Sequence, residues 1–326
     1  GTKIIKDNLA EDGSRYGTQK VLVKMTMGTY KGKEKQAINP SGTLFGADCK
    51  VGARIIVIVN KSGTNVGFTV YSQDRTMAIY GFALIFAAVV CAIGGKKGVY
   101  AILSLVFAFA CIIGIMFPMM YRGISPIVLT IIVAVLTTIV TLGLLGGYSS
   151  KTVSAILGTA IGVVIAAVAA MAFGKAAGIT GYNVSDIEAL NYVGQNTKIK
   201  IGELLFAGII ISALGAVMDV GMSIASTIQE IYETDKTLSM KRLFVSGINV
   251  GRDMMGTMTN TLIFAYVGGA MTTLVINYAY DLSYRQLANS YVIGIEIMQG
   301  LSGSLGVVLT VPITALIASF LAVRKK

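Results

Sequence analysis

The stretch SALGAVMDVGMSIAS, residues 212–226, decides how the rest of the chain is interpreted. It has the pattern of a long apolar helix that carries a single carboxylate, Asp219, deep inside it. An ionised side chain at that depth costs a few kcal/mol on insertion scales, so such residues are rare in membranes and mark ion or proton sites. The stretch therefore predicts a membrane-embedded chain with a functional group at Asp219.

Composition supports a membrane location for most of the chain. The 326 residues are 54% hydrophobic and only 13% charged, and the mean hydropathy is +0.73. Soluble domains carry about 25% charged residues, so this composition excludes an ordinary soluble protein. The sequence contains no histidine, which excludes histidine triads and most zinc sites. Cys49, Cys91 and Cys111 have no metal or redox spacing and are expected to be small buried hydrophobes.

Residues 1–75 are expected to form a separate β-rich domain. VLVKMTMGTY, residues 21–30, alternates with the period of a half-buried strand, and ARIIVIVN (53–60) and VGFTVY (66–71) follow as two further strands. The pattern predicts a small SH3-like or OB-like barrel. The positive charge of this domain is typical of a solvated surface. Alternatively, it attracts an anionic lipid, polymer or solute. No aromatic-and-basic stripe indicates nucleic-acid binding.

Residues 76–326 are expected to form a transmembrane helical bundle. Seven apolar segments have about the length that crosses the hydrocarbon layer: 77–94, 98–119, 126–147, 152–173, 203–226, 255–278 and 292–322. The last is longer than one span requires, and the sequence leaves open whether GLSGSLG at residues 300–306 breaks it. Small-residue faces, at Gly143–Gly147 and at Gly158 with Gly162, suit packing within one bundle or between copies, so a homo-oligomer stays open.

The distribution of Lys and Arg predicts the orientation of the bundle. The connections richer in these residues include Lys96, Lys97, Lys236, Lys241 and Arg242, and they are expected to be cytoplasmic. The β-rich domain is then extracytoplasmic and the C-terminus is cytoplasmic. With that domain outside the cell, we expect a signal or anchor helix before Gly1 in the native protein. TLSMKRLFVSGI, residues 237–248, is predicted to be an amphipathic helix on the inner leaflet.

Two polar stripes are predicted to face each other in the membrane. On the span 203–226, small or polar residues recur at three- or four-residue steps and share one face: Ser212, Gly215, Asp219, Ser223 and Ser226. On the next span the corresponding residues are Asp253, Thr257 and Asn260, with Thr259 nearby and Arg252 at the cytoplasmic mouth. With a rise of about 1.5 Å per residue, Asp219 and Asn260 fall at similar depths.

We predict that Asp219, Ser223, Thr257 and Asn260 bind the coupling ion. A buried carboxylate binds H⁺, and hydroxyl and amide oxygens suit Na⁺, because hard cations favour oxygen ligands. The alternative is a structural polar clamp between two helices. Glu296 and Gln299, in the last segment, belong either to the outer end of a polar path or to the membrane–water interface. No metal cluster and no organic cofactor are expected.

The motifs GAVMDVGMSIAS (215–226), NVGRDMMGTMTNTL (249–262) and GSLGVVLTVPITALIA (303–318) carry a resemblance to a known family. Through them the chain resembles the YibE/F family of bacterial membrane proteins, from about Met77 to the end. The resemblance implies a multi-pass protein of the bacterial cell membrane and supplies little chemistry.

A second pattern is similar to half of the resistance-nodulation-division (RND) core, which SecDF-type translocation motors share. It consists of a Gly-x-x-x-Asp helix, a cytoplasmic amphipathic helix, and a Thr-rich helix opened by Gly-Arg. The similarity implies a proton relay at Asp219, with Gly215 four residues before it and Thr257 and Thr259 on the next helix. The chain departs from that core in three ways. Four spans precede the aspartate helix, this helix has one aspartate rather than a pair, and no repeated second half is visible.

These observations favour a transporter or exporter coupled to H⁺ or Na⁺, moving an unknown small solute or lipid-like cargo. The alternative is a membrane-anchored receptor or assembly factor, whose external β-rich domain binds a partner while the intramembrane polar groups are structural. A passive channel comes third. An enzyme is not expected, because no acid pair, no nucleophile with a base and no metal cluster is recognisable.

Overall fold

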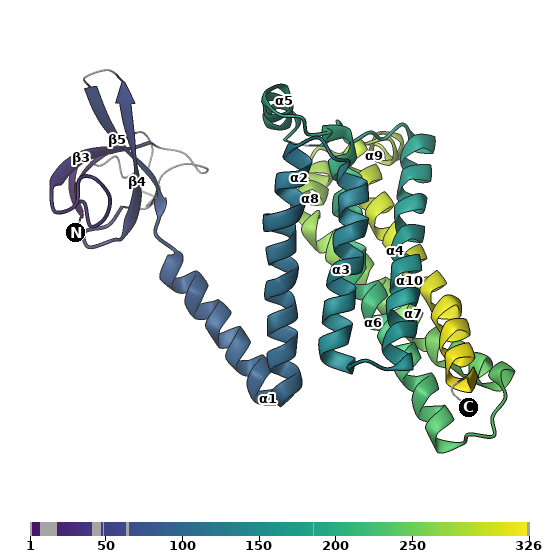
Figure 1. Ribbon diagram of the computed structural model, residues 1–326. Helices are drawn as coiled ribbons and strands as arrows, with labels where there is room; N and C mark the ends of the chain where they lie inside the picture. Colours follow the sequence, from purple (N-terminus) through teal and green to yellow (C-terminus); the bar gives the residue numbers. More distant parts are fainter. Residues whose placement is uncertain are drawn as a thin grey trace. The chain divides into compact units, whose positions relative to one another are not determined.

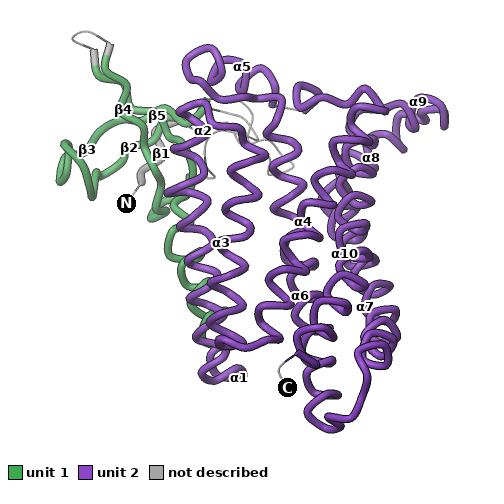
Figure 2. Tube along the Cα trace, turned by 45° about the vertical axis from the view of Figure 1, so that its right-hand side comes forward, with its two compact units in different colours: residues 1–89 green, residues 90–326 purple. Residues whose placement is uncertain are grey.

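The computed structural model describes residues 2–6, 18–40, 47, 49–62, 65–184 and 186–324. The chain divides into two compact units, residues 1–89 and 90–326 (Figure 2). The sheet ends at Gln73 and the first helix begins at Thr76, so the division between the units falls inside that helix.

The first unit contains one five-stranded mixed sheet. Its strands are β1 (Thr2–Lys6), β2 (Gln19–Lys24), β3 (Glu34–Asn39), β4 (Ile55–Ser62) and β5 (Asn65–Gln73), in the order β1-β2-β3-β5-β4. Among the strand pairs that the structure describes, β3–β5 is parallel and the others are antiparallel. Val21, Val23 and Val70 are buried together with Cys49, as alternation predicts for a half-buried strand. Among the described strands β1 and β4 are the two edges, so the SH3-like or OB-like closure stays a prediction.

The first long helix turns back on itself at Gly95. Helix α1 (Thr76–Cys111) continues through a π-turn, η1 (Ile112–Met116), into α2 (Phe117–Tyr121). Gly95 has φ 52° and ψ −131°, a conformation that favours glycine. A Cβ on Gly98 would collide with the carbonyl oxygen of Val90, an atom that a straight helix would hold about 12 Å away. The break therefore lies between the predicted segments 77–94 and 98–119.

In the part of the chain that the structure describes, five helical stretches are long and apolar enough to cross a membrane: Thr76–Tyr121, Pro126–Gly146, Ser150–Ala177, Ile201–Thr234 and Tyr291–Arg324. A sixth is the pair Met240–Gly269 and Met271–Ala279, which is bent by 59°. A helix of 46 residues, Thr76–Tyr121, would measure about 69 Å if it were straight, more than twice the hydrocarbon thickness. The structure thus shows five or six candidate spans, and the number seven stays a prediction that depends on counting the two sides of Gly95 separately.

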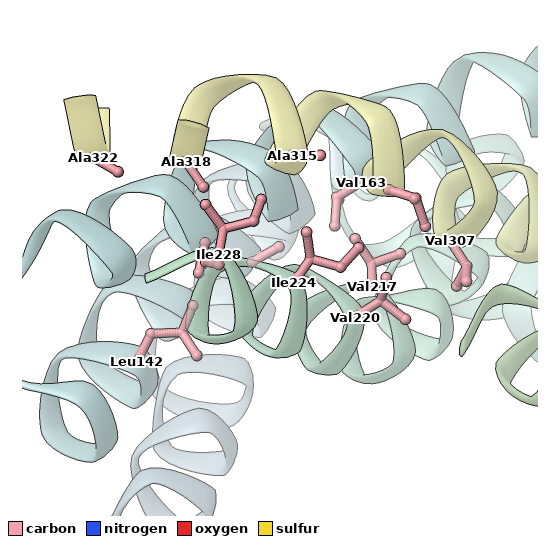
Figure 3. Packing of buried hydrophobic residues seen from close by; sticks show 14 of the residues in the cluster. Leu142, Val163, Val217, Val220, Ile224, Ile228, Val307, Ala315, Ala318 and Ala322 are labelled. Carbon is pink, nitrogen blue, oxygen red and sulfur yellow. The ribbon is translucent and has the colours of Figure 1, made fainter. Parts of the chain in front are cut away.

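The second unit is a bundle of long helices, drawn in Figure 1. The helices that follow α2 are α3 (Pro126–Gly146), α4 (Ser150–Ala177), α5 (Ile187–Asn196), α6 (Leu204–Thr234), α7 (Met240–Gly269), α8 (Met271–Ala279), α9 (Tyr284–Ala288) and α10 (Tyr291–Arg324), with a short 3₁₀ turn, η2 (Ile201–Glu203), before α6. Helices α4 and α7 each pack against both α6 and α10. Val217, Ile224 and Ile228 of α6 are completely buried in this core (Figure 3).

Helices α4 and α10 cross closely because their contact positions are small. A side chain on Gly158 would meet Thr314, one on Gly162 would meet Thr310, and one on Gly306 would meet Ala166. These pairs step by four residues along each helix in opposite directions, so one antiparallel ridge of small residues runs along the crossing. Small residues at helix contacts let backbones approach in a membrane, where packing rather than water exclusion drives association.

The structure corrects one detail of the sequence prediction and answers one question that the sequence left open. Residues 240–248, predicted to belong to a separate amphipathic helix on the membrane surface, are the first part of α7, which runs unbroken from Met240 to Gly269. The segment 292–322 is one helix, α10, which contains Pro312 and is not interrupted at GLSGSLG. Ser239 starts α7 by accepting a hydrogen bond from the backbone N–H of Arg242, as an N-cap serine does.

Candidate functional site

The polar stripe of α6 lies on one face, and that face points away from the packed core. Ser212, Gly215 and Asp219 are exposed in the isolated chain, and Ser223 and Ser226 are half-buried. The opposite face packs into the core through residues that are fully buried: Ala213, Val217, Val220 and Ile224. Periodicity therefore predicted which residues share a face, and the structure adds that Gly215 and Asp219 on this face are exposed.

Asp219 has no partner in the described part of the chain. None of the hydrogen bonds or ion pairs of the described residues involves its carboxylate. Helix α6 packs against α3, α4, α7 and α10, and the packed side of the helix is the side opposite to Asp219. Among the described residues, the carboxylate is therefore held neither by a hydroxyl nor by a cation.

The depths of the two stripes have to be revised, because α6 and α7 extend further than predicted. Asp219 lies fifteen residues before Thr234 and Asn260 lies twenty residues after Met240, or about 22 Å and 30 Å from the α6–α7 connection. Positions 228 and 224 of α6 pack against positions 247 and 251 of α7. If this antiparallel register continues along both helices, Asp219 of α6 lies level with residues 256–257 of α7. Asn260 of α7 then lies level with Gly215 of α6.

The polar residues of α7 do not converge on Asp219. Arg252, Asp253, Thr257 and Asn260 are exposed. The hydroxyl of Thr257 donates to the backbone carbonyl of Met254 at 3.0 Å, so its own helix satisfies it. Arg252 and Asp253 lie twelve and thirteen residues inside α7, which begins at Met240, so their place at the cytoplasmic mouth of the span stays a prediction. Thr259 has a buried hydroxyl oxygen without a partner among the described residues.

A hydrogen bond that sequence reasoning missed joins the two helices. The hydroxyl of Tyr266 on α7 donates to the hydroxyl oxygen of Ser212 on α6, with 2.7 Å between the oxygens. Tyr266 also lines a hollow of about 330 Å³ with Glu296 and Gly300 of α10. Gln299 is half-buried on the same helix. Of the predicted polar path, the structure therefore brings Glu296 close to Tyr266, and Tyr266 to Ser212.

Removing the Tyr266 hydroxyl is expected to loosen the α6–α7 contact without unfolding the bundle. Interhelical hydrogen bonds in membranes contribute about 0.6 kcal/mol on average and at most about 1.7 kcal/mol. Tyr266→Phe should therefore lower the unfolding free energy by about that average, measured by chemical unfolding in detergent. Tyr278→Phe, at an exposed tyrosine of α8, is the matched control and should change nothing. An equal loss in both variants would contradict the prediction.

Hydroxyl groups in the core form a second set that sequence reasoning missed. Thr159 of α4 and Thr314 and Ser319 of α10 are fully buried, and their oxygens have no hydrogen-bond partner among the described residues. Thr310 differs, because its hydroxyl donates to the carbonyl of Gly306 at 2.7 Å. Thr310 and Thr314 lie on the small-residue ridge, where glycines of α4 make room for them. Their position there indicates a role in helix packing.

The connection between α6 and α7 is shaped by a local turn. The hydroxyl and the backbone N–H of Thr237 donate to one carboxylate oxygen of Asp235, at 2.6 and 2.9 Å. These two bonds, with a smaller contribution from the charge of Arg242, hold the pKa of Asp235 below its usual value. Within the connection of residues 235–239, the segment 235–237 therefore forms a hydrogen-bonded turn at neutral pH.

Acid is expected to release this turn. The pKa of Asp235 is lower in the folded chain, so its stabilisation is complete above the ordinary carboxyl pKa of about 3.9 and disappears as the pH falls through the lower folded value. Hydrogen exchange at the Thr237 N–H should accelerate over that range relative to neighbouring amides. In Thr237→Val the pKa of Asp235 should move back towards the ordinary value. If the exchange rate of the Thr237 N–H relative to its neighbours stays constant while Asp235 titrates, the prediction is wrong.

In the described part of the chain, no three Cys, Asp or Glu side chains converge on a point where they would hold a metal ion. The candidate site consists of one carboxylate without a partner among the described residues, together with neighbouring hydroxyls and small residues on the same face of α6.

Comparison with known proteins assigns a family to most of this chain. A family model described as "YibE/F-like protein" matches residues 82–324. No curated protein and no solved structure matches the chain. The similarity to the RND core accordingly stays a hypothesis drawn from the sequence pattern.

Proposed function

The chain belongs to the YibE/F-like family of membrane proteins, and from that premise we propose that it is a multi-pass transporter or exporter driven by H⁺ or Na⁺ through Asp219. The coupling ion binds at the carboxylate of Asp219, with help from the hydroxyl of Ser223, one helical turn further along α6, and from Thr257, which lies at a similar level on α7. Asn260 and Gly215 lie about one helical turn away. The cargo is a small solute or a lipid-like molecule.

One observation carries the proposal, namely an unpaired carboxylate within a membrane-spanning helix. A structural clamp would hold Asp219 by hydrogen bonds, and none is found among the described residues. Keeping a carboxylate in a membrane without such partners costs about 2.5–3.5 kcal/mol on insertion scales. A group that costs this much and stabilises nothing is best explained by a function, and binding a cation is the function its chemistry suits.

The proposed orientation puts the sheet unit outside the cell and Arg324 inside, following the Lys and Arg distribution. If α1 is counted as two spans divided at Gly95, the bundle has seven spans. An odd number of spans puts the two ends of the bundle on opposite sides of the membrane. The extracytoplasmic unit then meets cargo before or after it crosses the membrane. No catalytic role is proposed for any residue.

The experiment that tests this function measures ion uptake in proteoliposomes. The liposomes contain a bacterial cell extract as a source of cargo, and an inward gradient of H⁺ or Na⁺ is imposed. Uptake is followed with a pH-sensitive dye and with a Na⁺ tracer. The proposal expects uptake above that of protein-free liposomes for one of the two ions. Uptake at the protein-free level for both ions would reject it.

A receptor or assembly factor is the second candidate, and one observation favours it. The sheet unit has a hollow of about 560 Å³ between the end of β2 and the start of β4, lined by Lys24, Arg54 and Asp74 among others. This volume falls in the range of ligand pockets. If binding there is the function, Arg54→Ala should abolish biological activity while Asp219→Asn leaves it intact. The transporter proposal expects sensitivity to Asp219→Asn.

A further inference from the structure

The hollow between α7 and α10 lies where these two helices stop packing together. The last close contact is at Gly300 of α10, where an added Cβ would lie 3.7 Å from the ring of Tyr266. After Gly269 the chain bends by 59° into α8, and α10 packs closely against α7 but at most loosely against α8. Ala270, at the bend, and Leu274 of α8 line the hollow. The bend therefore leaves an open space of about 330 Å³ beside α10.

The lining of this hollow is apolar except for one carboxylate. Apart from Glu296 and the phenol of Tyr266, the described residues that line it are aliphatic side chains, one alanine and one glycine. Glu296 is half-buried and takes part in no hydrogen bond or ion pair among the described residues. The hydroxyl of Tyr266 donates to Ser212, so it does not donate to Glu296. The hollow thus presents an unpaired carboxylate beside an apolar space.

A cation with an apolar body matches this lining in both charge and polarity. An acyl chain of a lipid would fill the space and leave the carboxylate of Glu296 without a partner, which is costly away from water. An anion would be repelled by the carboxylate. An ammonium group donates charge-assisted hydrogen bonds to a carboxylate, and an aromatic ring such as that of Tyr266 also attracts a cation. The volume is at the small end of the range of ligand pockets, so the ligand is small.

The position of the carboxylate along α10 suits an amphipathic ligand. Glu296 lies five residues after Tyr291, the first residue of α10, or about 8 Å from that end of the helix. Leu301, which also lines the hollow, lies about 15 Å from the same end. Since α10 is long enough to span the membrane, the charged group is nearer the end of the span and the apolar lining continues deeper. An amphipathic cation in a bilayer has the same orientation, because its charge stays near water.

We propose that the hollow between α7 and α10 binds a small amphipathic cation, an organic ammonium ion with an apolar body, whose charge pairs with the carboxylate of Glu296. The inference rests on the proposed function, because it names the chemical class of the cargo. Glu296 then holds the cargo and Asp219 the coupling ion. The hydrogen bond from Tyr266 to Ser212 joins the wall of the hollow to α6, the helix that carries Asp219.

The test compares three probes that share one apolar body and differ in charge: phenylbutylammonium, phenylbutanol and phenylbutyrate. Their binding to the full chain in nanodiscs of uncharged lipid is measured by titration calorimetry at neutral pH, with empty nanodiscs subtracted. We expect the ammonium ion to bind about tenfold more tightly than the alcohol, and the carboxylate probe to bind most weakly. Glu296→Gln should remove the preference for the cation and leave binding of the alcohol unchanged, which also shows that this variant is folded. Glu230→Gln, at an exposed position of α6, is the matched control and should change nothing.

A second pair of variants tests the place of binding. Val267→Trp fills the hollow and should weaken binding of both the ammonium ion and the alcohol, whereas Val275→Trp, at an exposed residue of α8 outside the lining, should weaken neither.

Equal binding of cation and alcohol by the wild type would overturn the inference and indicate a space for lipid tails only. A preference for the cation that survives in Glu296→Gln, or equal effects of the two tryptophan variants, would overturn it as well. None of these measurements needs ion flux. Ion uptake that depends on Asp219, without a preference for the cation, would reject this cargo alone. Cation binding that depends on Glu296, without any ion uptake, would reject the transporter alone.

Discussion

Replacing Gly162 by leucine is expected to prevent the bundle from assembling. In the structure a side chain at this position would run into the hydroxyl of Thr310, into Val217 at 2.8 Å and into the backbone carbonyl of Gly306 at 3.2 Å. A threonine side chain can rotate, but a backbone carbonyl inside α10 cannot. Overpacking of a well-packed core costs about 1–3 kcal/mol where side chains yield. Here three helices, α4, α6 and α10, would have to separate, so we expect a loss at or above that range.

The readout is the fraction of purified protein that elutes as one symmetric peak, together with the midpoint of thermal unfolding. The matched control is Gly143→Leu on α3, where an added Cβ meets nothing within 4 Å. It makes the same chemical change inside another spanning helix and should leave both readouts near the wild type. If Gly162→Leu folds as well as the control, the contact between α4 and α10 does not hold the bundle together.

Replacing Asp219 by asparagine is expected to abolish ion uptake while leaving the stability of the protein unchanged. Asparagine has nearly the same size and lacks the titratable and negatively charged oxygen, so it binds neither H⁺ nor Na⁺ with comparable affinity. The carboxylate makes no hydrogen bond among the described residues, so its replacement removes no contact. Surface-like positions without partners usually change the unfolding free energy by less than about 0.5 kcal/mol. Uptake should fall to that of protein-free liposomes.

The combination of the two readouts is what distinguishes the mechanisms. A structural clamp predicts lost stability and lost uptake together, whereas an ion site predicts lost uptake alone. Glu230→Gln removes a carboxylate from the same helix at an exposed position near its end, and it should preserve both readouts. Asp219→Glu keeps the charge and should retain part of the uptake. Full uptake by a folded Asp219→Asn protein would exclude Asp219 as the coupling group.

The helices were largely predictable from the sequence because apolar runs of sufficient length have few alternatives in a membrane. The predicted segments 126–147 and 152–173 correspond to α3 and α4 within a few residues. The start of α7 was not predictable in this way. Hydropathy indicates where a helix is apolar, whereas a helix ends where its backbone hydrogen bonds end. Residues 240–254 are polar enough to suggest a surface segment, yet they continue the same helix.

The sequence predicted which residues share the candidate face of α6, but it did not predict which neighbouring element that face meets. Spacing of three and four residues puts Ser212, Gly215 and Asp219 on one face, and the structure keeps them there. Spacing carries no information about which neighbour that face meets, so the expected encounter with Asn260 relied on assumed helix ends. Thr310 and Thr314 went unnoticed for a related reason. Single hydroxyls in an apolar helix become informative only when the glycines opposite them on α4 are known.

The fixed turn at Asp235 has a mechanical consequence. Helices of 31 and 30 residues are each about 45 Å long, some 15 Å longer than the hydrocarbon layer is thick. Because their connection is short and hydrogen-bonded, we expect the two helices to move as one arm rather than as two independent rods. A force applied at the tip, where Lys236 and Lys241 lie, is transmitted as a tilt of the whole arm. We therefore expect a partner that binds at that tip to shift Asp219 as well, because Asp219 lies on the same continuous helix, α6.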